Sequence, residues 1–247
     1  MNDQQYFDTH CHIDLFDHPE KIVSETERSR IRTTGVTNLP SHFKMGLPHV
    51  GHCQNVHLAL GLHPLMADQH TNDELKLFEE LLDETPYIGE IGLDFSWEGK
   101  STVEKQVESF RFALKHIDER HRLITIHSRG AEREVLQLLE DFDTRPSVFH
   151  WYSGPLSLIN DIVEAGHYFS LNPAMLQSKK GKALVERVAK ERILTETDGP
   201  HVETQGQAAR PNDVRLVVRE LADWWGSSMS EARKQIAENF RHLTSHS

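Results

Sequence analysis

The chain of 247 residues contains only two cysteines, Cys11 and Cys53. Two thiols are too few for the disulfide framework of a small secreted protein, so we expect both to be free. Cys11 lies between two histidines, and alternate residues of a strand point to opposite faces. We therefore expect Cys11 to pack as a small buried hydrophobic residue.

Long apolar runs are also missing. No stretch approaches the roughly 18 consecutive apolar residues that a membrane-spanning helix needs. The opening sequence, MNDQQ, is polar and lacks the basic and then apolar pattern of a secretory signal peptide. We therefore expect no membrane partner and a cytoplasmic location.

Basic residues are outnumbered, with 27 Lys and Arg against 38 Asp and Glu and a formal net charge of -11. This excludes a protein that coats nucleic acid through a broad basic surface, because such binding depends on many Lys and Arg contacts to phosphates. Divalent cations held by clustered carboxylates neutralise part of such a charge locally. An acidic chain can therefore still hold a phosphate in a metal-lined cleft.

The sequence does contain a regular alternation of apolar runs and amphipathic segments. Eight candidate strands span residues 6–9, 36–39, 56–62, 87–92, 123–127, 148–150, 168–171 and 193–197. Amphipathic segments of helical length include residues 102–117, 131–142, 155–165 and 180–190. This alternation, in a chain of 247 residues, predicts a parallel (β/α)8 TIM barrel that spans residues 1–247 as a single domain.

Beyond the last candidate strand, residues 212–225 and 230–241 are predicted to form two closing helices, the second opening at Ser230. The preceding loop, residues 198–211, is rich in Gly, Pro, Gln and Ala. It follows a strand at the face where barrel enzymes place their chemistry. We expect it to form part of a substrate rim.

The most informative motif is DTHCH at residues 8–12, at the end of the first candidate strand. Residues i and i+2 of a strand project from one face, so His10 and His12 can bind one metal ion together. Asp8 shares that face and is predicted to orient a ligand imidazole from behind.

Four more residues with metal-binding side chains end other candidate strands: Glu90, His127, His150 and Asp198. The carboxyl ends of barrel strands meet at one face, which predicts that these side chains converge. Each histidine alone could instead be a buried imidazole bonded to backbone. Their joint placement favours a metal centre.

Glu90 lies among apolar residues, where an unpaired carboxylate is very costly, and a carboxylate can bridge two metal ions. Glu90 is therefore the bridging candidate. Glu196 shares the face of Asp198, and we expect one of the two to be a ligand and the other a support. Mixed imidazole and carboxylate ligands are compatible with zinc, manganese or iron, and with magnesium when the substrate adds oxygen ligands.

In this order the motifs resemble those of the TatD-type metal-dependent deoxyribonucleases, a branch of the amidohydrolase-like barrels. The resemblance runs from Phe7 to about Leu243 and rests on residues 8–12, 61–64, 89–94, 127–129, 150 and 196–200. It implies two divalent cations per subunit, zinc, manganese or magnesium. It further implies that one cation is held by His10, His12, Glu90 and Asp198, and the second by Glu90, His127 and His150.

The resemblance also implies roles around the scissile phosphate. His63 and Arg129 fall where the family contacts that phosphate, and Arg210 could approach it, although a surface role for Arg210 is equally open. The cations polarise the phosphodiester and lower the pKa of water. Asp198 is then placed to accept the proton of the attacking water.

The chain departs from the commoner family pattern at residues 170–175, SLNPAM, which stand in place of a small Ser-rich turn. With the short segment 97–99, this variant is similar to the TatD-type component of Qat anti-phage defence cassettes. That similarity implies a role in antiviral defence and protein partners from a defence complex.

The predicted function is metal-dependent hydrolysis of DNA, as an exonuclease on single-stranded or frayed ends. Phe95, Trp97, Trp151 and Tyr152 follow candidate strands and could stack on bases, although packing roles are common for such residues. One alternative is an amidohydrolase-like deacylase or esterase acting on a small molecule or an aminoacyl-tRNA. Many such enzymes have a bridging Lys where this chain has Glu90. A second alternative, a binding protein with vestigial catalysis, is disfavoured by the intact ligand set.

Overall fold

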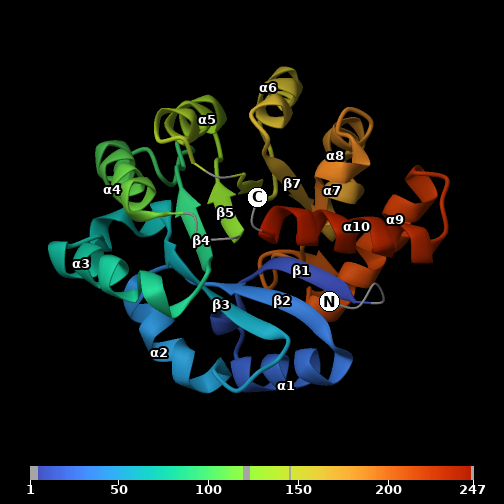
Figure 1. Cartoon of the computed structure of the whole chain (residues 1–247), viewed down its shortest axis with the longest axis horizontal. Helices are drawn as coiled ribbons and strands as arrows, with labels where there is room; N and C mark the ends of the chain where they lie inside the picture. The colour runs from blue at the N-terminus through green and yellow to red at the C-terminus, as the bar shows by residue number, and fades with distance from the viewer. Residues whose placement is uncertain (1–4, 119–122, 145, 246–247) are drawn as a thin grey trace.

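Eight parallel strands surrounded by helices form the body of the molecule (Figure 1). The computed structural model describes residues 5–118, 123–144 and 146–245. The strands pair in chain order and every pairing is parallel. They are β1 (Tyr6–Cys11), β2 (Ile31–Val36), β3 (Val56–Leu62), β4 (Tyr87–Gly92), β5 (Leu123–His127), β6 (Val148–Phe149), β7 (Tyr168–Leu171) and β8 (Ile193–Thr195). The predicted (β/α)8 barrel is confirmed.

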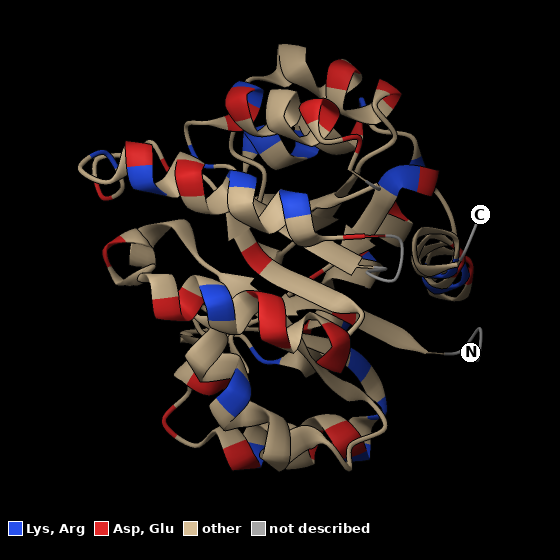
Figure 2. Ribbon diagram, turned by 60° about the vertical axis from the view of Figure 1, so that its left-hand side comes forward, with Lys and Arg blue, Asp and Glu red and all other residues tan. Residues whose placement is uncertain are grey.

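The helices form an outer layer around the strands (Figure 1). They are α1 (Pro19–Ser29), α2 (Pro40–Val50), α3 (Asn72–Leu81), α4 (Val103–His116), α5 (Glu132–Asp141), α6 (Ile159–Glu164), α7 (Pro173–Leu176), α8 (Lys179–Val185), α9 (Val214–Trp224) and α10 (Met229–Thr244). Lys and Arg are intermixed with Asp and Glu along the helices visible in Figure 2. Within the described ranges, no helix combines the length and the apolar content required to cross a membrane.

Short 3-10 helices connect several of these elements. They are η1 (Ile13–Leu15), η2 (Pro64–Gln69), η3 (Leu82–Glu84), η4 (Leu156–Leu158), η5 (Lys190–Arg192) and η6 (Pro211–Asp213). The loop 198–211 also contains a small antiparallel hairpin of β9 (Glu203–Thr204) and β10 (Gln207–Ala208). Cys11 is fully buried in the core, as predicted, and both cysteines are free.

Hydrogen bonds between the first and last strands close the barrel. The Thr9 hydroxyl donates to the Thr195 carbonyl over 3.1 Å, and the Thr195 hydroxyl donates to the Phe7 carbonyl over 2.5 Å. Past the end of β8, the Asp198 N–H donates to the His10 carbonyl over 2.9 Å. Closure therefore places Asp198 directly beside the histidine motif of β1.

Helix α10 packs against the amino ends of β1 and β8. The Phe240 ring stacks on Phe7 with centroids 4.5 Å apart, and the Asn239 amide donates to the Ile193 carbonyl over 2.7 Å. This helix was predicted to open at Ser230, but it begins at Met229. The Ser228 hydroxyl caps it by accepting from the Glu231 N–H. The carboxyl ends of the strands, at the opposite face, hold the candidate site.

The second strand was predicted at residues 36–39, and this was wrong. The observed strand, β2, spans Ile31–Val36, and its centre contains Arg32, Thr33 and Thr34. Both threonines are buried, and the Thr33 hydroxyl donates to the Ile31 carbonyl. A hydrogen-bonded threonine can occupy a barrel wall, so an apolar run was the wrong signal here.

Several smaller boundaries also differ from the predicted ones. The helix predicted over residues 180–190 is α8 and ends at Val185, and the last strand ends at Thr195 instead of residue 197. The first closing helix, predicted over 212–225, comprises η6 and α9. His150 lies just beyond β6, which ends at Phe149. Strand ends next to a site lose regular pairing because their side chains and backbone bond to other groups.

Glycine at residue 89 lets β4 approach β5 closely. Gly89 has a φ of 152°, and a Cβ added there would lie 2.1 Å from the Cγ2 atom of Thr125. The space that a side chain would fill at residue 89 is occupied by β5, whose end carries His127 next to Glu90.

We predict that buried His167 makes the fold less stable in acid. Its Nδ1 atom accepts the Ser147 N–H over 3.0 Å, and burial, with a smaller contribution from Arg192, lowers the pKa of His167 from 6.5 to about 4. Above pH 6.5 the imidazole is neutral in both states. As the pH falls from 6.5 towards 4, His167 takes up a proton in the unfolded chain but stays neutral in the folded protein. The free energy of unfolding therefore falls by up to about 3 kcal/mol between these two pH values.

Urea unfolding of wild type and His167→Gln between pH 7 and pH 4 measures this loss. We expect the variant to have a shallower fall in unfolding free energy with decreasing pH, whatever its stability at pH 7. His18→Gln is the control, because the His18 side chain is 63% exposed. Equal slopes for wild type and His167→Gln would contradict the assignment.

Candidate metal centre

A cavity of about 700 Å³ opens at the carboxyl ends of the strands. Its lining includes six of the residues singled out from the sequence: His12, His63, Glu90, His127, His150 and Asp198. These side chains come from the ends of β1, β3, β4, β5, β6 and β8. The barrel thus brings together residues that are up to 186 positions apart, counting from His12 to Asp198.

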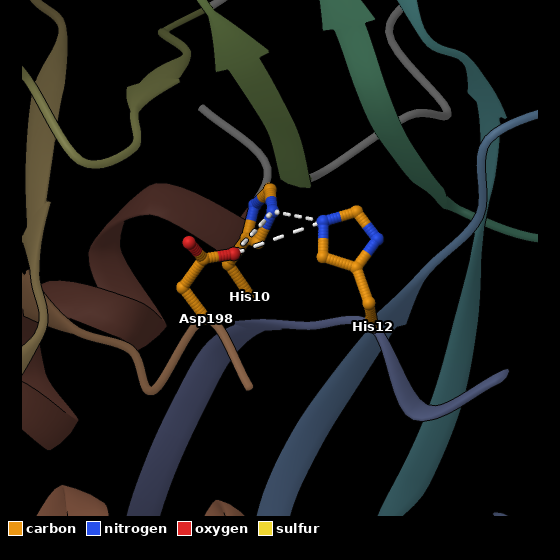
Figure 3. A group of neighbouring side chains, drawn as sticks. All are labelled: His10, His12 and Asp198. Atoms are coloured by element: carbon orange, nitrogen blue, oxygen red, sulfur yellow. Dashed lines mark hydrogen bonds and ion pairs between the residues drawn. The ribbon is translucent and has the colours of Figure 1, made fainter. Parts of the chain in front are cut away.

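The first group consists of His10, His12 and Asp198 (Figure 3). The two Nε2 atoms lie 3.4 Å apart, and Oδ1 of Asp198 lies 3.6 Å from Nε2 of His10 and 3.7 Å from Nε2 of His12. All three side chains are at most 3% exposed. Figure 3 shows the two rings and the carboxylate converging on one point, as ligands of one cation do.

Glu90 lies at the centre of the imidazoles. Its Oε1 atom is 2.6 Å from Nδ1 of His127 and 2.8 Å from Nε2 of His150. Its Oε2 atom is 3.4 Å from Nε2 of His10 and 3.2 Å from Nε2 of His12. The carboxylate therefore joins the histidines of β1 to those that follow β5 and β6.

His63 belongs to the same cluster. Its Nε2 atom lies 3.3 Å from Oε2 of Glu90, and its Nδ1 atom accepts the Leu65 N–H at the start of η2. His63, Glu90 and His127 together could hold a cation. His63 is therefore a candidate metal ligand. It also lines the cavity, where the resemblance implied a contact with the phosphate.

Two carboxylates orient the histidines of β5 and β6. Oδ2 of Asp94 lies 2.7 Å from Nε2 of His127, on the ring edge opposite Glu90. Oε1 of Glu196 lies 3.7 Å from Nδ1 of His150. Such carboxylates fix the orientation of an imidazole and make it a better ligand.

Glu196 is itself firmly held. Its oxygens accept the Trp151 N–H over 3.0 Å, the Asn172 amide over 3.1 Å, and the Ser170 hydroxyl. Asn172 also accepts the Met175 N–H, so the segment 172–175 that departs from the commoner family pattern helps to hold Glu196. Of the pair Asp198 and Glu196, Asp198 faces His10 and His12, and Glu196 supports His150.

Asp8 was predicted to orient a ligand imidazole, and the structure places it elsewhere. Its carboxylate accepts the Thr197 N–H over 2.9 Å, the Thr197 hydroxyl over 2.5 Å, and the backbone N–H of His10 over 3.4 Å. His10 instead uses Nδ1 to bond the Thr125 hydroxyl over 2.7 Å. Asp8 therefore holds the backbone beside Asp198 and does not touch a ring nitrogen.

Asp198 has an unusual backbone and an unusual proton affinity. Its φ of 51° is in the left-handed region, which non-glycine residues rarely adopt outside special sites. Burial raises the pKa of Asp198 to about 7, and the nearby carboxylates of Glu196 and Glu90 add to the rise. His150 and His12 oppose it. Without a cation, this carboxylate takes up a proton near neutrality.

Glu90 has the opposite character. Burial alone would raise the pKa of Glu90, but the surrounding imidazoles, His63 and His150 foremost, hold it well below its usual range. Burial, reinforced by His150, lowers the pKa of His10 to about 3, so the His10 ring is neutral. A neutral imidazole and an ionised carboxylate are the forms that bind metal.

Arg129 lines the cavity, as expected, but it already has a partner. Its Nη1 atom donates to Oε2 of Glu98 over 2.6 Å, and both side chains are more than half exposed. A phosphate that approaches Arg129 must therefore compete with Glu98.

Arg210 lies away from this cavity. Its Nη1 atom donates to Oε2 of Glu25 in α1 over 2.9 Å, and it lines a separate cavity of about 670 Å³ beside the β9–β10 hairpin. The expected phosphate contact of Arg210 at the metal centre is not supported by this position. The sequence alone could not reveal Glu25 as its partner.

The residues present fit bound divalent cations. Oε2 of Glu90 and Oδ1 of Asp198 are buried without a hydrogen-bond partner among the described residues, although imidazole nitrogens lie 3.2–3.7 Å away. Buried carboxylate oxygens left in this way are costly unless a charge compensates them. A cation bound by these atoms would satisfy both oxygens.

Three residues near the centre were not singled out from the sequence. Asp94 and Thr125 bond the rings of His127 and His10. His201 lines the cavity and its ring lies edge-on to that of His12, with centroids 4.8 Å apart. Asp94 ends the motif at residues 89–94 and could have been found there, but Thr125 and His201 carry no signal of their own.

The fold and this cluster define a class of protein: a barrel hydrolase that depends on metal ions. The family described as TatD related DNase matches residues 7–245, and the chain belongs to that family. It is therefore an enzyme, a metal-dependent hydrolase of the TatD DNase family.

Individual relatives agree with this assignment. The chain is 30% identical over 249 residues to the uncharacterized metal-dependent hydrolase MJ1582 of Methanocaldococcus jannaschii. The matched region covers 97% of this chain and 96% of the relative. It is 27% identical over 197 residues to the 3'-5' ssDNA/RNA exonuclease TatD of Dickeya dadantii, across 74% of each. The structure of YJJV, a TatD homolog from Escherichia coli K12, matches with a TM-score of 0.85 at 24% identity over 97% of each chain, which shows a common fold.

We predict that manganese stabilises the protein through Glu90. A ligand at about 100 times its Kd stabilises a folded protein by about 2.7 kcal/mol, which raises the Tm of a domain of this size by about 5–10 °C. Wild type should show this rise on addition of manganese, and Glu90→Gln should lose most of it. Each variant is compared with its own metal-free Tm.

Glu98→Gln is the matched control, because Glu98 also lines the cavity but pairs with Arg129. It should keep the full rise in Tm. An undiminished rise in Glu90→Gln would show that Glu90 does not hold a cation.

Proposed function

We propose that this enzyme is an exonuclease that removes nucleotides from single-stranded or frayed ends of DNA with the help of two divalent cations. The observation that carries the proposal is the position of Glu90, whose two oxygens face two different sets of histidines. A carboxylate in this position can bridge two cations in a phosphodiester hydrolase.

The proposed ligand sets are those that the family resemblance implies, and the short distances around Glu90 support them. His10, His12, Glu90 and Asp198 would hold one cation, and Glu90, His127 and His150 the other, with zinc, manganese and magnesium as the candidates. When bound, the cations polarise the phosphodiester and lower the pKa of water. His63 lies close enough to Glu90 to take part in the same cluster.

Asp198 is the proposed proton acceptor. It is held beside β1 by the bond from its N–H to the His10 carbonyl, and its Oδ1 atom accepts no hydrogen bond from the described residues. Its side chain lines the cavity, where it can take the proton of the attacking water. Asp8 secures this position through Thr197.

The cavity size favours a strand end as substrate. A space of about 700 Å³ is typical of a small-molecule site, so it can take a terminal nucleotide but not a stacked duplex. His63 and Arg129 provide N–H groups on its wall for the phosphate. The relative from Dickeya dadantii, named an exonuclease of single-stranded DNA and RNA, supports the same substrate class.

We predict that Glu90→Ala and Asp198→Asn abolish most of the activity. Purified protein with saturating manganese is incubated with single-stranded DNA labelled at either end, and the product ladders give activity and polarity. Asp198→Asn keeps the shape but removes the proton acceptor, so kcat should fall by about 10²–10⁴-fold. Glu90→Ala should be inactive because both proposed cation sites lose a ligand.

Two outcomes would contradict the proposal. One is intact DNA with folded, metal-loaded wild type. The other is faster hydrolysis of p-nitrophenyl esters than of bis-p-nitrophenyl phosphate, which would indicate the amidohydrolase-like deacylase or esterase instead. Near wild-type rates for Asp198→Asn would remove Asp198 from the mechanism alone.

We predict that Glu98 weakens DNA binding by occupying Arg129. Glu98→Gln replaces a carboxylate with a neutral amide, so Arg129 becomes available to a phosphate. The KM for single-stranded DNA should fall several-fold at low salt, and the gain should shrink as salt screens the exposed charges. Arg129→Gln should raise KM, and the double variant should show no gain from the Glu98 change. An unchanged KM in Glu98→Gln would contradict competition.

We also propose a cytoplasmic role in anti-phage defence with partner proteins. The support is the resemblance of residues 170–175 and 97–99 to the TatD-type component of Qat cassettes. Phage plating on cells that express the chain together with its neighbouring genes tests this role. Protection by wild type and none by Glu90→Ala is expected, and equal protection by both would contradict a catalytic part in defence.

A further inference from the structure

We propose that Trp151 is the platform on which the terminal base of the DNA strand stacks. This inference rests on the proposed exonuclease function and adds the residue that recognises the base. Four aromatic residues follow strands near the site, and they differ in exposure and contacts: Phe95, Trp97, Trp151 and Tyr152.

Three of the four are engaged elsewhere. Tyr152 is 3% exposed and its hydroxyl donates to the Pro155 carbonyl over 2.8 Å. Phe95 is partly buried and packs against the core. Trp97 is 80% exposed, but Nζ of Lys100 lies 3.2 Å from its ring centroid and Trp97 is not part of the described cavity lining.

Trp151 lines the cavity and is 37% exposed. Its φ is 35°, a left-handed backbone that tryptophan rarely adopts, and its N–H donates to Oε1 of Glu196 over 3.0 Å. Glu196 also faces His150, the preceding residue. The backbone of Trp151 is thereby held in fixed relation to the metal centre, and strained backbone of this kind is concentrated at functional sites.

Three apolar side chains line another part of the cavity wall. Leu15 and Leu65 are each about two-fifths exposed, and with Met66 they line the cavity. They follow β1 and β3, whereas Trp151 follows β6, which the strand order places across the barrel from β2. Apolar side chains therefore stand on both sides of a polar floor.

This division matches the chemistry of a nucleotide. The imidazoles and carboxylates of the floor suit cations and a phosphodiester, and the apolar walls suit a flat ring with little charge. Tryptophan stacks on any base through its face, so the platform would tolerate different sequences. It would also require an unpaired end, because a base paired within a duplex has its faces covered by its neighbours.

The test compares two single-stranded oligonucleotides that differ only at the terminal residue, which carries a base in one and is abasic in the other. For the oligonucleotide with the base, kcat/KM of Trp151→Ala should fall by about 10–100-fold, as expected for the loss of one stacked base. For the abasic oligonucleotide, wild type should already be slow and Trp151→Ala should change little. Trp151→Phe should retain most of the activity because it keeps an aromatic face.

Trp97→Ala is the matched control, an exposed tryptophan outside the cavity, and it should behave as wild type on both substrates. The rise in Tm on addition of manganese should be unchanged in Trp151→Ala, since the bond to Glu196 comes from the backbone. An equal loss on both oligonucleotides would show that Trp151 only positions His150 and Glu196. No loss on either would also overturn the platform. Inactive wild type would overturn the nuclease proposal, and the platform with it.

Discussion

The whole site depends on one buried carboxylate. Glu90 is 1% exposed. Moving a carboxylate from water into the protein interior costs several kcal/mol unless other groups compensate its charge. The compensation comes from imidazoles at the ends of β1, β3, β5 and β6, all within 3.4 Å of its oxygens. The ring of parallel strands presents these side chains to one point. The metal centre therefore depends on the barrel.

A second layer of polar contacts surrounds the cluster. The Thr125 hydroxyl bonds the His10 ring and the Asp94 carboxylate bonds the His127 ring, while a Glu196 oxygen lies 3.7 Å from Nδ1 of His150. Asp8 acts through backbone and hydroxyl groups at Thr197, which keeps Asp198 in place despite its left-handed φ. Ligands oriented in this way need little rearrangement to bind a cation, and little rearrangement is what preorganised catalysis requires.

The negative charge of the chain is compatible with a DNA substrate because recognition is concentrated in a small cavity. The arginines expected at the phosphate are already paired, Arg129 with Glu98 and Arg210 with Glu25. In the proposed nuclease, attraction comes mainly from the cations that the site would hold, and selectivity from the apolar side chains around Trp151. A nuclease of this design would engage one strand end and would not slide along a duplex by surface charge.

The sequence by itself determined the alternation of strands and helices, the positions of the candidate ligands near strand ends, and the shared face of His10 and His12. These features follow from the local spacing of residues along the chain. It did not determine β2, where buried Thr33 and Thr34 replace an apolar run. The tertiary structure alone decided which polar groups meet. Asp94 reaches His127, Asp8 reaches Thr197, and Glu98 reaches Arg129 through packing between distant segments. Contacts of this kind depend on strand closure and loop geometry, which hydropathy along the chain does not encode.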